Sequence, residues 1–181
     1  MKQSIHTLSL LAFLFFIPGL LYAQKFSSLA VPDYGNIRTI PQAVQPDPSI
    51  EYKMVIDVSS SSDDPEFINP GLFNLARLMN LHRAGGIDPE NLQVTAVIHG
   101  GATFSTLDNK GYQKKHGIDN PNIDLIDQLK EAGVQLFICG QSLYIRNKGL
   151  KNVNPQIDIS LSAMTVVSEY QAKGYSLLIF D

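Results

Sequence analysis

From residue 52 onward, short apolar segments alternate with amphipathic ones, and this alternation restricts the possible fold more than any other feature of the sequence. Strands that are apolar on both faces are typical of parallel sheets covered by helices on both sides. The sequence therefore predicts an α/β domain with a mostly parallel five-stranded sheet, wound in the doubly wound manner. The expected strands are YKMVIDV (52–58), LQVTAVIHG (92–100), VQLFIC (134–139), IDIS (157–160) and YSLLIF (175–180).

Helices are expected between these strands. Asn69 and Pro70 supply an N-cap and a first-turn proline for the first helix. Asn122 is expected to cap the second helix, and apolar residues at helical spacing give each helix an inner face. The predicted helices cover about 70–84, 123–132, 141–148 and 162–173, whereas the polar segment NKGYQKKHG (109–117) is assigned no regular element.

The first 23 residues have the layout of a secretory signal peptide. Lys2 precedes an apolar stretch that ends at Ala23, with a probable cut before Gln24. The alternative is a membrane anchor, but the stretch is shorter than the roughly 20 residues that span a bilayer. We therefore expect a periplasmic or secreted protein with no membrane insertion after cleavage.

Residues 24–50 contain four prolines and no helical or strand period, which predicts an extended arm ahead of the domain at 51–181. The arm also carries apolar residues, among them Val31 and Ile37. It is therefore expected to lie against a surface, with a flexible linker as the alternative.

Composition argues against several classes of function. The net charge is −3 without a basic cluster, so nucleic acid and anionic membranes are poor candidate partners. A single cysteine excludes an internal disulfide and a C-x-x-C redox motif. No G-x-G-x-x-G or phosphate-binding loop follows a strand, and the positions of His82 and His116 match no metal site. We therefore expect neither a metal nor another cofactor.

Cys139 is the candidate catalytic residue, because it ends a predicted strand directly before a predicted helix. Sites in such folds form beyond the carboxyl ends of the strands. Donors at a helix N-terminus favour the thiolate, the form that attacks sulfur. An inert buried cysteine is the alternative. Asp57 and His99 end neighbouring strands, although a satisfied strand-end histidine is also possible. The candidate binding residues are His99, Gly100, Gly101, Gly140, Gln141 and Ser142.

The segments GVQLFICGQSLYIRNKGL and IDISLSAMTVVSEYQAKGYSLLIF resemble the DsrE/DsrF-like family of small sulfur-relay proteins. VIDVSS and VTAVIHGGAT resemble that family's first two strands, so the resemblance covers about 52–181. It implies a five-stranded three-layer α/β sandwich that assembles into homotrimers or homohexamers. It also implies that Cys139, at the matching position, carries persulfide sulfur between partner proteins. The predicted export is a departure, since the well-described relay members are cytoplasmic.

Two hypotheses about function remain open at this stage. In the first, the protein is a periplasmic sulfur carrier or sulfurtransferase accessory that holds sulfane sulfur on Cys139 and exchanges it with a donor or acceptor protein. In the second, it is a non-catalytic oligomeric module whose cleft binds a small ligand or a protein, with Cys139 only lining the cleft. The reactivity of the thiol separates the two.

Overall fold

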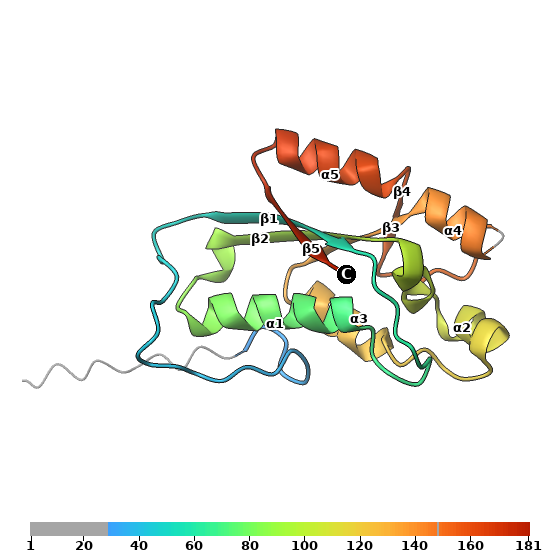
Figure 1. Cartoon of the computed structure of the whole chain (residues 1–181), viewed down its shortest axis with the longest axis horizontal. Helices are drawn as coiled ribbons and strands as arrows, with labels where there is room; N and C mark the ends of the chain where they lie inside the picture. The colour runs from blue at the N-terminus through green and yellow to red at the C-terminus, as the bar shows by residue number, and fades with distance from the viewer. Residues whose placement is uncertain (1–28, 148) are drawn as a thin grey trace, which may run out of the picture.

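The computed structural model describes residues 29–147 and 149–181. Its centre is a five-stranded sheet in which every neighbouring pair of strands is parallel (Figure 1). The predicted α/β fold with a parallel five-stranded sheet is thus confirmed. The strands are β1 (Tyr52–Val58), β2 (Leu92–Ile98), β3 (Gln135–Cys139), β4 (Asp158–Ser160) and β5 (Ser176–Phe180), in the spatial order β4-β3-β2-β1-β5.

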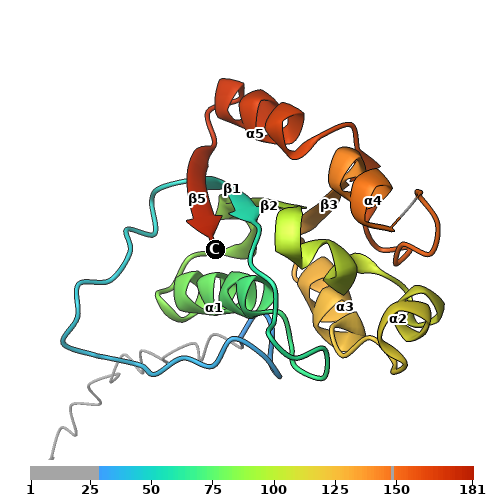
Figure 2. The same cartoon turned by 45° about the vertical axis from the view of Figure 1, so that its right-hand side comes forward.

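Helices cover both faces of the sheet. Helices α1 (Pro70–Ala84) and α3 (Ile123–Glu131) lie on one face and α5 (Ala163–Ala172) lies on the other (Figures 1 and 2). Helix α4 (Gly140–Asn147) continues directly from the carboxyl end of β3. Asn69 caps α1 by accepting a hydrogen bond from the backbone of Leu72 at 3.1 Å, as its sequence position predicts.

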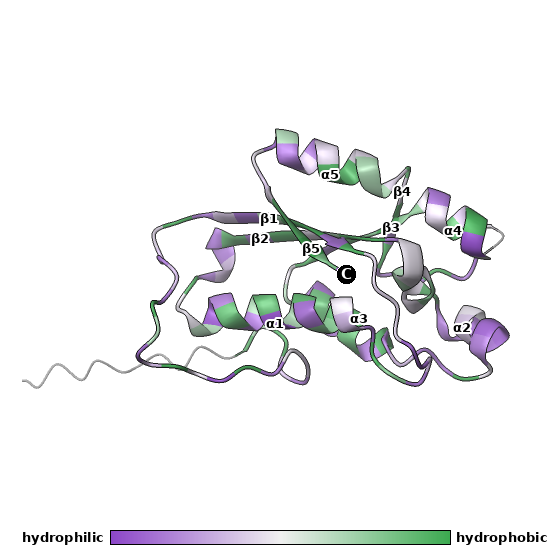
Figure 3. Cartoon of the chain, viewed as in Figure 1, coloured by the Kyte–Doolittle hydropathy of each residue, from purple (hydrophilic) through white to green (hydrophobic). Residues whose placement is uncertain are grey.

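Two apolar clusters fill the space between these layers, because successive side chains of a strand point to opposite faces. Met54, Ile56 and Val58 of β1 belong to the larger cluster, which α1 and α3 cover. Val55, Val97 and Cys139 belong to the smaller cluster beneath α5. Figure 3 colours much of β2 and β5 as hydrophobic, whereas the helices alternate between hydrophobic and hydrophilic residues.

The structure corrects three expectations about local structure. The segment 109–117 contains a helix, α2 (Asn109–His116), which Asp108 caps. Strand β2 ends at Ile98, and a 3₁₀ segment, η2 (Gly100–Thr106), follows it; another, η1 (Pro89–Asn91), precedes β2. Asn122 occupies the N-cap position of α3, as expected, but its side chain makes no capping hydrogen bond. Its side-chain oxygen instead accepts a hydrogen bond from the backbone of Asn69 at 2.7 Å.

The described part of the arm lies along α1 of the same chain (Figure 2). Asn80, fully buried on α1, accepts a hydrogen bond from the Val31 backbone at 2.8 Å. Its amide donates to the carbonyls of Val31 at 2.9 Å and Tyr34 at 2.8 Å. Gly35, with φ of 65°, packs so closely on α1 that a Cβ would lie 2.2 Å from the Arg77 backbone. The arm is therefore attached to its own domain.

Residues 1–23, the predicted signal peptide, lie outside the described residues. Within 29–147 and 149–181, no helix has both the length and the apolar composition that crossing a membrane requires.

Candidate functional site

The only cysteine lies at the junction of β3 and α4. Cys139 is the last residue of the strand and Gly140 is the first residue of the helix, so no loop separates them. The junction is tight: a Cβ on residue 140 would lie 2.6 Å from the carbonyl oxygen of Ser160, which only a glycine avoids. The Cys139 side chain is 5% exposed and packs in the cluster beneath α5.

Hydrogen-bond donors surround the Cys139 sulfur. Burial raises the pKa of the thiol, because it disfavours the charged form. The backbone N–H groups of Ser142 and Ala163, and the Ser142 hydroxyl, lower the pKa by donating to the sulfur. The backbone N–H of Gln141 adds a weaker contribution in the same direction. The hydrogen bonds together prevail, and the pKa lies below that of an ordinary cysteine. The site therefore stabilises a thiolate.

These donors come from two helix N-termini rather than one. Gln141 and Ser142 lie in the first turn of α4, whereas Ala163 is the first residue of α5. The Ser162 side chain caps α5 by accepting from the Met164 backbone at 3.2 Å. The contribution of α5 was not predicted from the sequence. A helix that follows a parallel strand begins at the carboxyl edge of the sheet, and this rule could have placed Ala163 near the thiol.

The candidate binding residues at the end of β2 are connected to the thiol through Ser142. The backbone N–H of Gly100 donates to the Ser142 hydroxyl at 3.4 Å, and that hydroxyl donates to the Cys139 sulfur. Gly100 has a positive φ of 54°, which turns the chain sharply after β2. Gly101 packs against the chain after β1, where a Cβ would lie 3.0 Å from the Ser59 carbonyl oxygen. The structure thus brings both glycines beside the β3–α4 junction.

His99 and Asp57 form a hydrogen-bonded pair between Nε2 of the ring and Oδ1 of the carboxylate. Both side chains are about a quarter exposed. Asp57 follows Val55 by two residues, and His99 follows Val97 by two, so both point to the face that carries Cys139. The sequence placed them at strand ends but did not predict this contact. Strand alternation predicts it only together with the pairing of β1 and β2.

The remaining polar residues lie at the edge of this site or away from it. The Gln141 side chain reaches the Leu161 carbonyl at 3.4 Å. His82 bonds the Leu78 carbonyl, and His116 stacks on Tyr112 on helix α2. Within the described residues, no three His, Cys, Asp or Glu side chains are grouped so that they could hold a metal ion.

Large apolar side chains lie exposed around the β3–α4 junction, and we call this set the apolar rim. Its residues belong to α4, to β4 and to the segment that begins α5. Figure 3 shows hydrophobic residues on both α4 and α5. The exposed fractions range from 46% to 79%. Isolated apolar residues are common on protein surfaces, but contiguous ones mark contact surfaces. The apolar rim consists of Tyr144, Ile145, Ile159, Leu161 and Met164.

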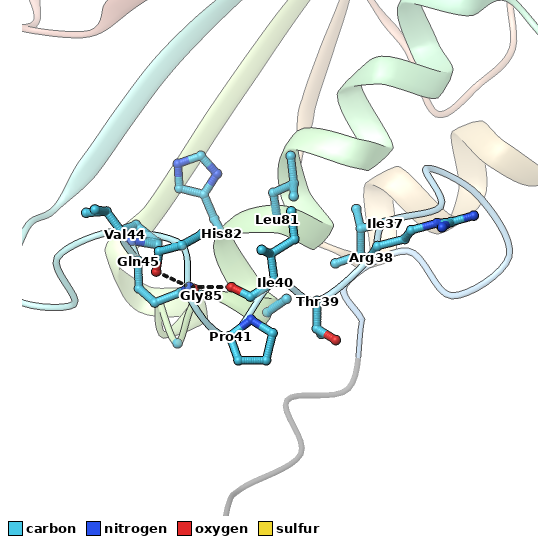
Figure 4. Close-up of a pocket in the computed structure, with 14 residues that line it drawn as sticks. Ile37, Arg38, Thr39, Ile40, Pro41, Val44, Gln45, Leu81, His82 and Gly85 are labelled. Carbon is cyan, nitrogen blue, oxygen red and sulfur yellow. Dashed lines mark hydrogen bonds between the residues drawn. The ribbon is translucent and has the colours of Figure 1, made fainter.

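A hollow in the described part of the chain lies away from Cys139. It has a volume of about 700 Å³ and is formed between the arm and the end of α1 (Figure 4). Ile40 and Val44 of the arm face Leu81 and His82 of α1 across it. Its lining includes Thr39 and His82 but no cysteine, aspartate or glutamate.

Comparisons with known proteins agree with this architecture. A family model described as the DsrE/DsrF-like family matches residues 53–180. Among solved structures, the chain is similar to the protein of unknown function MTH1491 from Methanobacterium thermoautotrophicum, with 16% identity and a TM-score of 0.52. That match covers 71% of this chain and 99% of the other. The search of curated proteins found no match.

Proposed function

The chain belongs to the DsrE/DsrF-like family, and on that premise we propose that it carries sulfane sulfur as a persulfide on Cys139. The observation that supports this function is the set of donors aimed at the sulfur from the first turns of α4 and α5. Their combined effect lowers the pKa of the thiol despite its burial. Thiolate is the species that attacks a sulfane sulfur, so the site is suited to accept one.

The same donors serve the loaded state. Backbone N–H groups at helix N-termini bind anionic sulfur as well as other anions, because the helix dipole adds to the hydrogen bonds. The tight Gly140 turn holds the sulfur close to Gln141 and Ser142. A persulfide formed here is therefore held in the fold until a partner removes the outer sulfur.

Intact mass measurement tests the carrier function. After incubation of the purified protein with polysulfide or thiosulfate, the mass is expected to rise by about 32 Da and to return after reduction. Cys139→Ser and Cys139→Ala are the matched controls; both should keep the fold and take up no sulfur. A wild-type protein that gains no mass, and whose thiol resists alkylation until the protein is unfolded, would refute the carrier function.

The low exposure of Cys139 favours one alternative. A side chain that is 5% exposed can also line a closed cleft without reacting. In that case the protein is a non-catalytic module that binds a small ligand or a protein beside His99 and Gly100. The alkylation experiment separates the two functions, because only the carrier has a thiol that reacts in the folded protein.

We also propose that the protein forms a homotrimer or homohexamer through the apolar rim, and that a sulfur donor or acceptor protein reaches the thiol beside this contact. The exposed side chains of Tyr144, Ile145, Leu161 and Met164 support a protein contact next to the thiol. Light scattering is expected to give a mass of three or six chains. Replacement of Leu161 by Glu should shift that mass towards the monomer. A wild-type monomer at micromolar concentration would contradict the assembly.

The proposed site of action is the periplasm or the exterior of the cell. This proposal depends on the signal-like sequence of residues 2–23. N-terminal sequencing of the exported protein should begin within a few residues of Gln24. A product that retains Met1 and sediments with membranes would overturn it.

A further inference from the structure

The carrier function proposed above assigns no role to His99 and Asp57, although the two side chains form a hydrogen-bonded pair near Cys139. His99 Nε2 is bonded to the Asp57 carboxylate, and among the described residues the other ring nitrogen, Nδ1, has no hydrogen-bond partner. A carboxylate accepts hydrogen bonds, so Nε2 carries a proton and neutral His99 has a lone pair on Nδ1. The ring is therefore oriented in one tautomer, with a free proton-accepting atom.

The register of the sheet places His99 next to Cys139 at the carboxyl ends of β2 and β3. Ile98 of β2 is paired with Ile138 of β3, so the next residues, His99 and Cys139, are neighbours across the two strands. Both side chains point to the face beneath α5. A second connection runs through the backbone: Gly100, directly after His99, donates to the Ser142 hydroxyl that in turn bonds the sulfur.

We infer that His99 is the proton carrier of sulfur transfer at Cys139 and that Asp57 is its positioning residue. The inference rests on the proposed carrier function. The donor that benefits from such a group is a thiol persulfide, R–S–SH, because its leaving thiolate is basic and must be protonated. General acid catalysis by a positioned histidine commonly accelerates such steps by about 100-fold or more.

The step balances without an oxidant or a reductant. The Cys139 thiolate forms a bond to the outer sulfur of R–S–SH, and the S–S bond of the donor breaks. The electron pair of that bond goes to the inner sulfur, which takes a proton from Nδ1 of protonated His99 and leaves as R–SH. The proton lost by the Cys139 thiol thus departs on the donor thiol. The Asp57 carboxylate stabilises the imidazolium while it holds that proton.

The test compares two reactions of the same thiol. Glutathione persulfide has a basic leaving thiolate, whereas the iodide that leaves iodoacetamide needs no proton. His99→Asn and His99→Gln should slow the uptake of sulfur from glutathione persulfide by about 100-fold and leave the rate of alkylation by iodoacetamide unchanged. Asp57→Asn should show the same selective loss. His116→Asn, which alters a histidine on α2, is the matched control and should change neither rate.

Each outcome decides the inference. If the His99 variants take up sulfur as fast as wild type, or if both reactions slow equally, His99 does not carry the proton. If the wild-type protein takes up no sulfur at all, the carrier function itself fails, which is a different result. Circular dichroism of each variant establishes that the fold is intact.

Discussion

Replacement of Asn80 by alanine should detach the arm from α1. The Asn80 side chain is fully buried and makes three hydrogen bonds of 2.8–2.9 Å to the backbone of Val31 and Tyr34. Each such bond contributes about 1 kcal/mol net, so their loss amounts to about 3 kcal/mol. If the arm stayed in place, its backbone groups would remain buried without partners, at a further cost of about 1–3 kcal/mol each. Undocking is therefore the favoured response.

Undocking of the arm also has a free-energy cost, because it exposes an apolar side chain. Val31, which is fully buried against the core, would become exposed, and that exposure is worth about 1.5–3 kcal/mol. The hydrogen bonds alone account for about 3 kcal/mol, and the exposure of Val31 adds to this, so we expect Asn80→Ala to lower the free energy of unfolding by about 3–6 kcal/mol. Urea unfolding followed by circular dichroism measures this change. Arg38 is an exposed residue of the arm. Trypsin should also cut the variant faster at this residue, because the arm is no longer held on α1.

A matched control lies on the same helix. The Asn74 side chain is partly buried and accepts an exposed hydrogen bond from Arg77 at 3.3 Å, so Asn74→Ala should change the stability by less than about 0.5 kcal/mol. A loss below about 1 kcal/mol for Asn80→Ala, with no faster cleavage in the arm, would refute the reasoning. It would mean that the arm is not held by these hydrogen bonds in solution.

Three further predictions concern the site and the surface. Ser142→Ala removes a donor that lowers the pKa of Cys139, so the midpoint of iodoacetamide alkylation should move to higher pH and the rate at neutral pH should fall; an unchanged midpoint would contradict the donor role. Gly140→Ala places a Cβ 2.6 Å from a backbone carbonyl and should lower the stability to urea by about 1–3 kcal/mol, whereas wild-type stability would show that the turn relaxes. Lys173→Gln breaks the exposed pair with Glu169 and should leave the urea midpoint within error, so a clear shift would contradict its solvent-exposed character.

The sequence predicted the framework of the fold because the framework depends on local patterns. Each strand was placed within two residues of its observed bounds, and the capping role of Asn69 was correct. Helix α2 was missed because only Gly111 and Tyr112 of its eight residues are buried, which leaves no apolar period to detect. The cap at Asp108 and the left-handed Gly117 that ends the helix were its local signals. Asn122 lies at the predicted cap position of α3 but makes no side-chain capping bond, because its oxygen accepts from the backbone of Asn69, which is distant in sequence.

The site was predictable only in part, because some of its contacts depend on residues that are distant in sequence. The position of Cys139 at a strand end follows from the local sequence. The N–H group of Ala163 and the contact between Asp57 and His99 join segments that are far apart in the chain. Locating them requires the order and register of the strands, and a single sequence does not give these. Once the strand order is known, side-chain alternation shows which residues share a face. Val55 and Val97 lie beneath α5, so Asp57 and His99, two residues later, point to the same face.

The place of β5 in the sheet has a consequence for how the protein reaches its final state. Strand β1 is an inner strand whose two neighbours are β2 and β5, and β5 comes almost a full domain later in the sequence. A chain that emerges from its N-terminus, from a ribosome or through a translocation channel, leaves one side of β1 without backbone partners until residues 176–180 arrive. Pairings between segments so far apart form slowly, and an unpaired strand edge promotes aggregation. Chains interrupted before residue 176 should therefore depend on chaperones far more than their small loss in length implies.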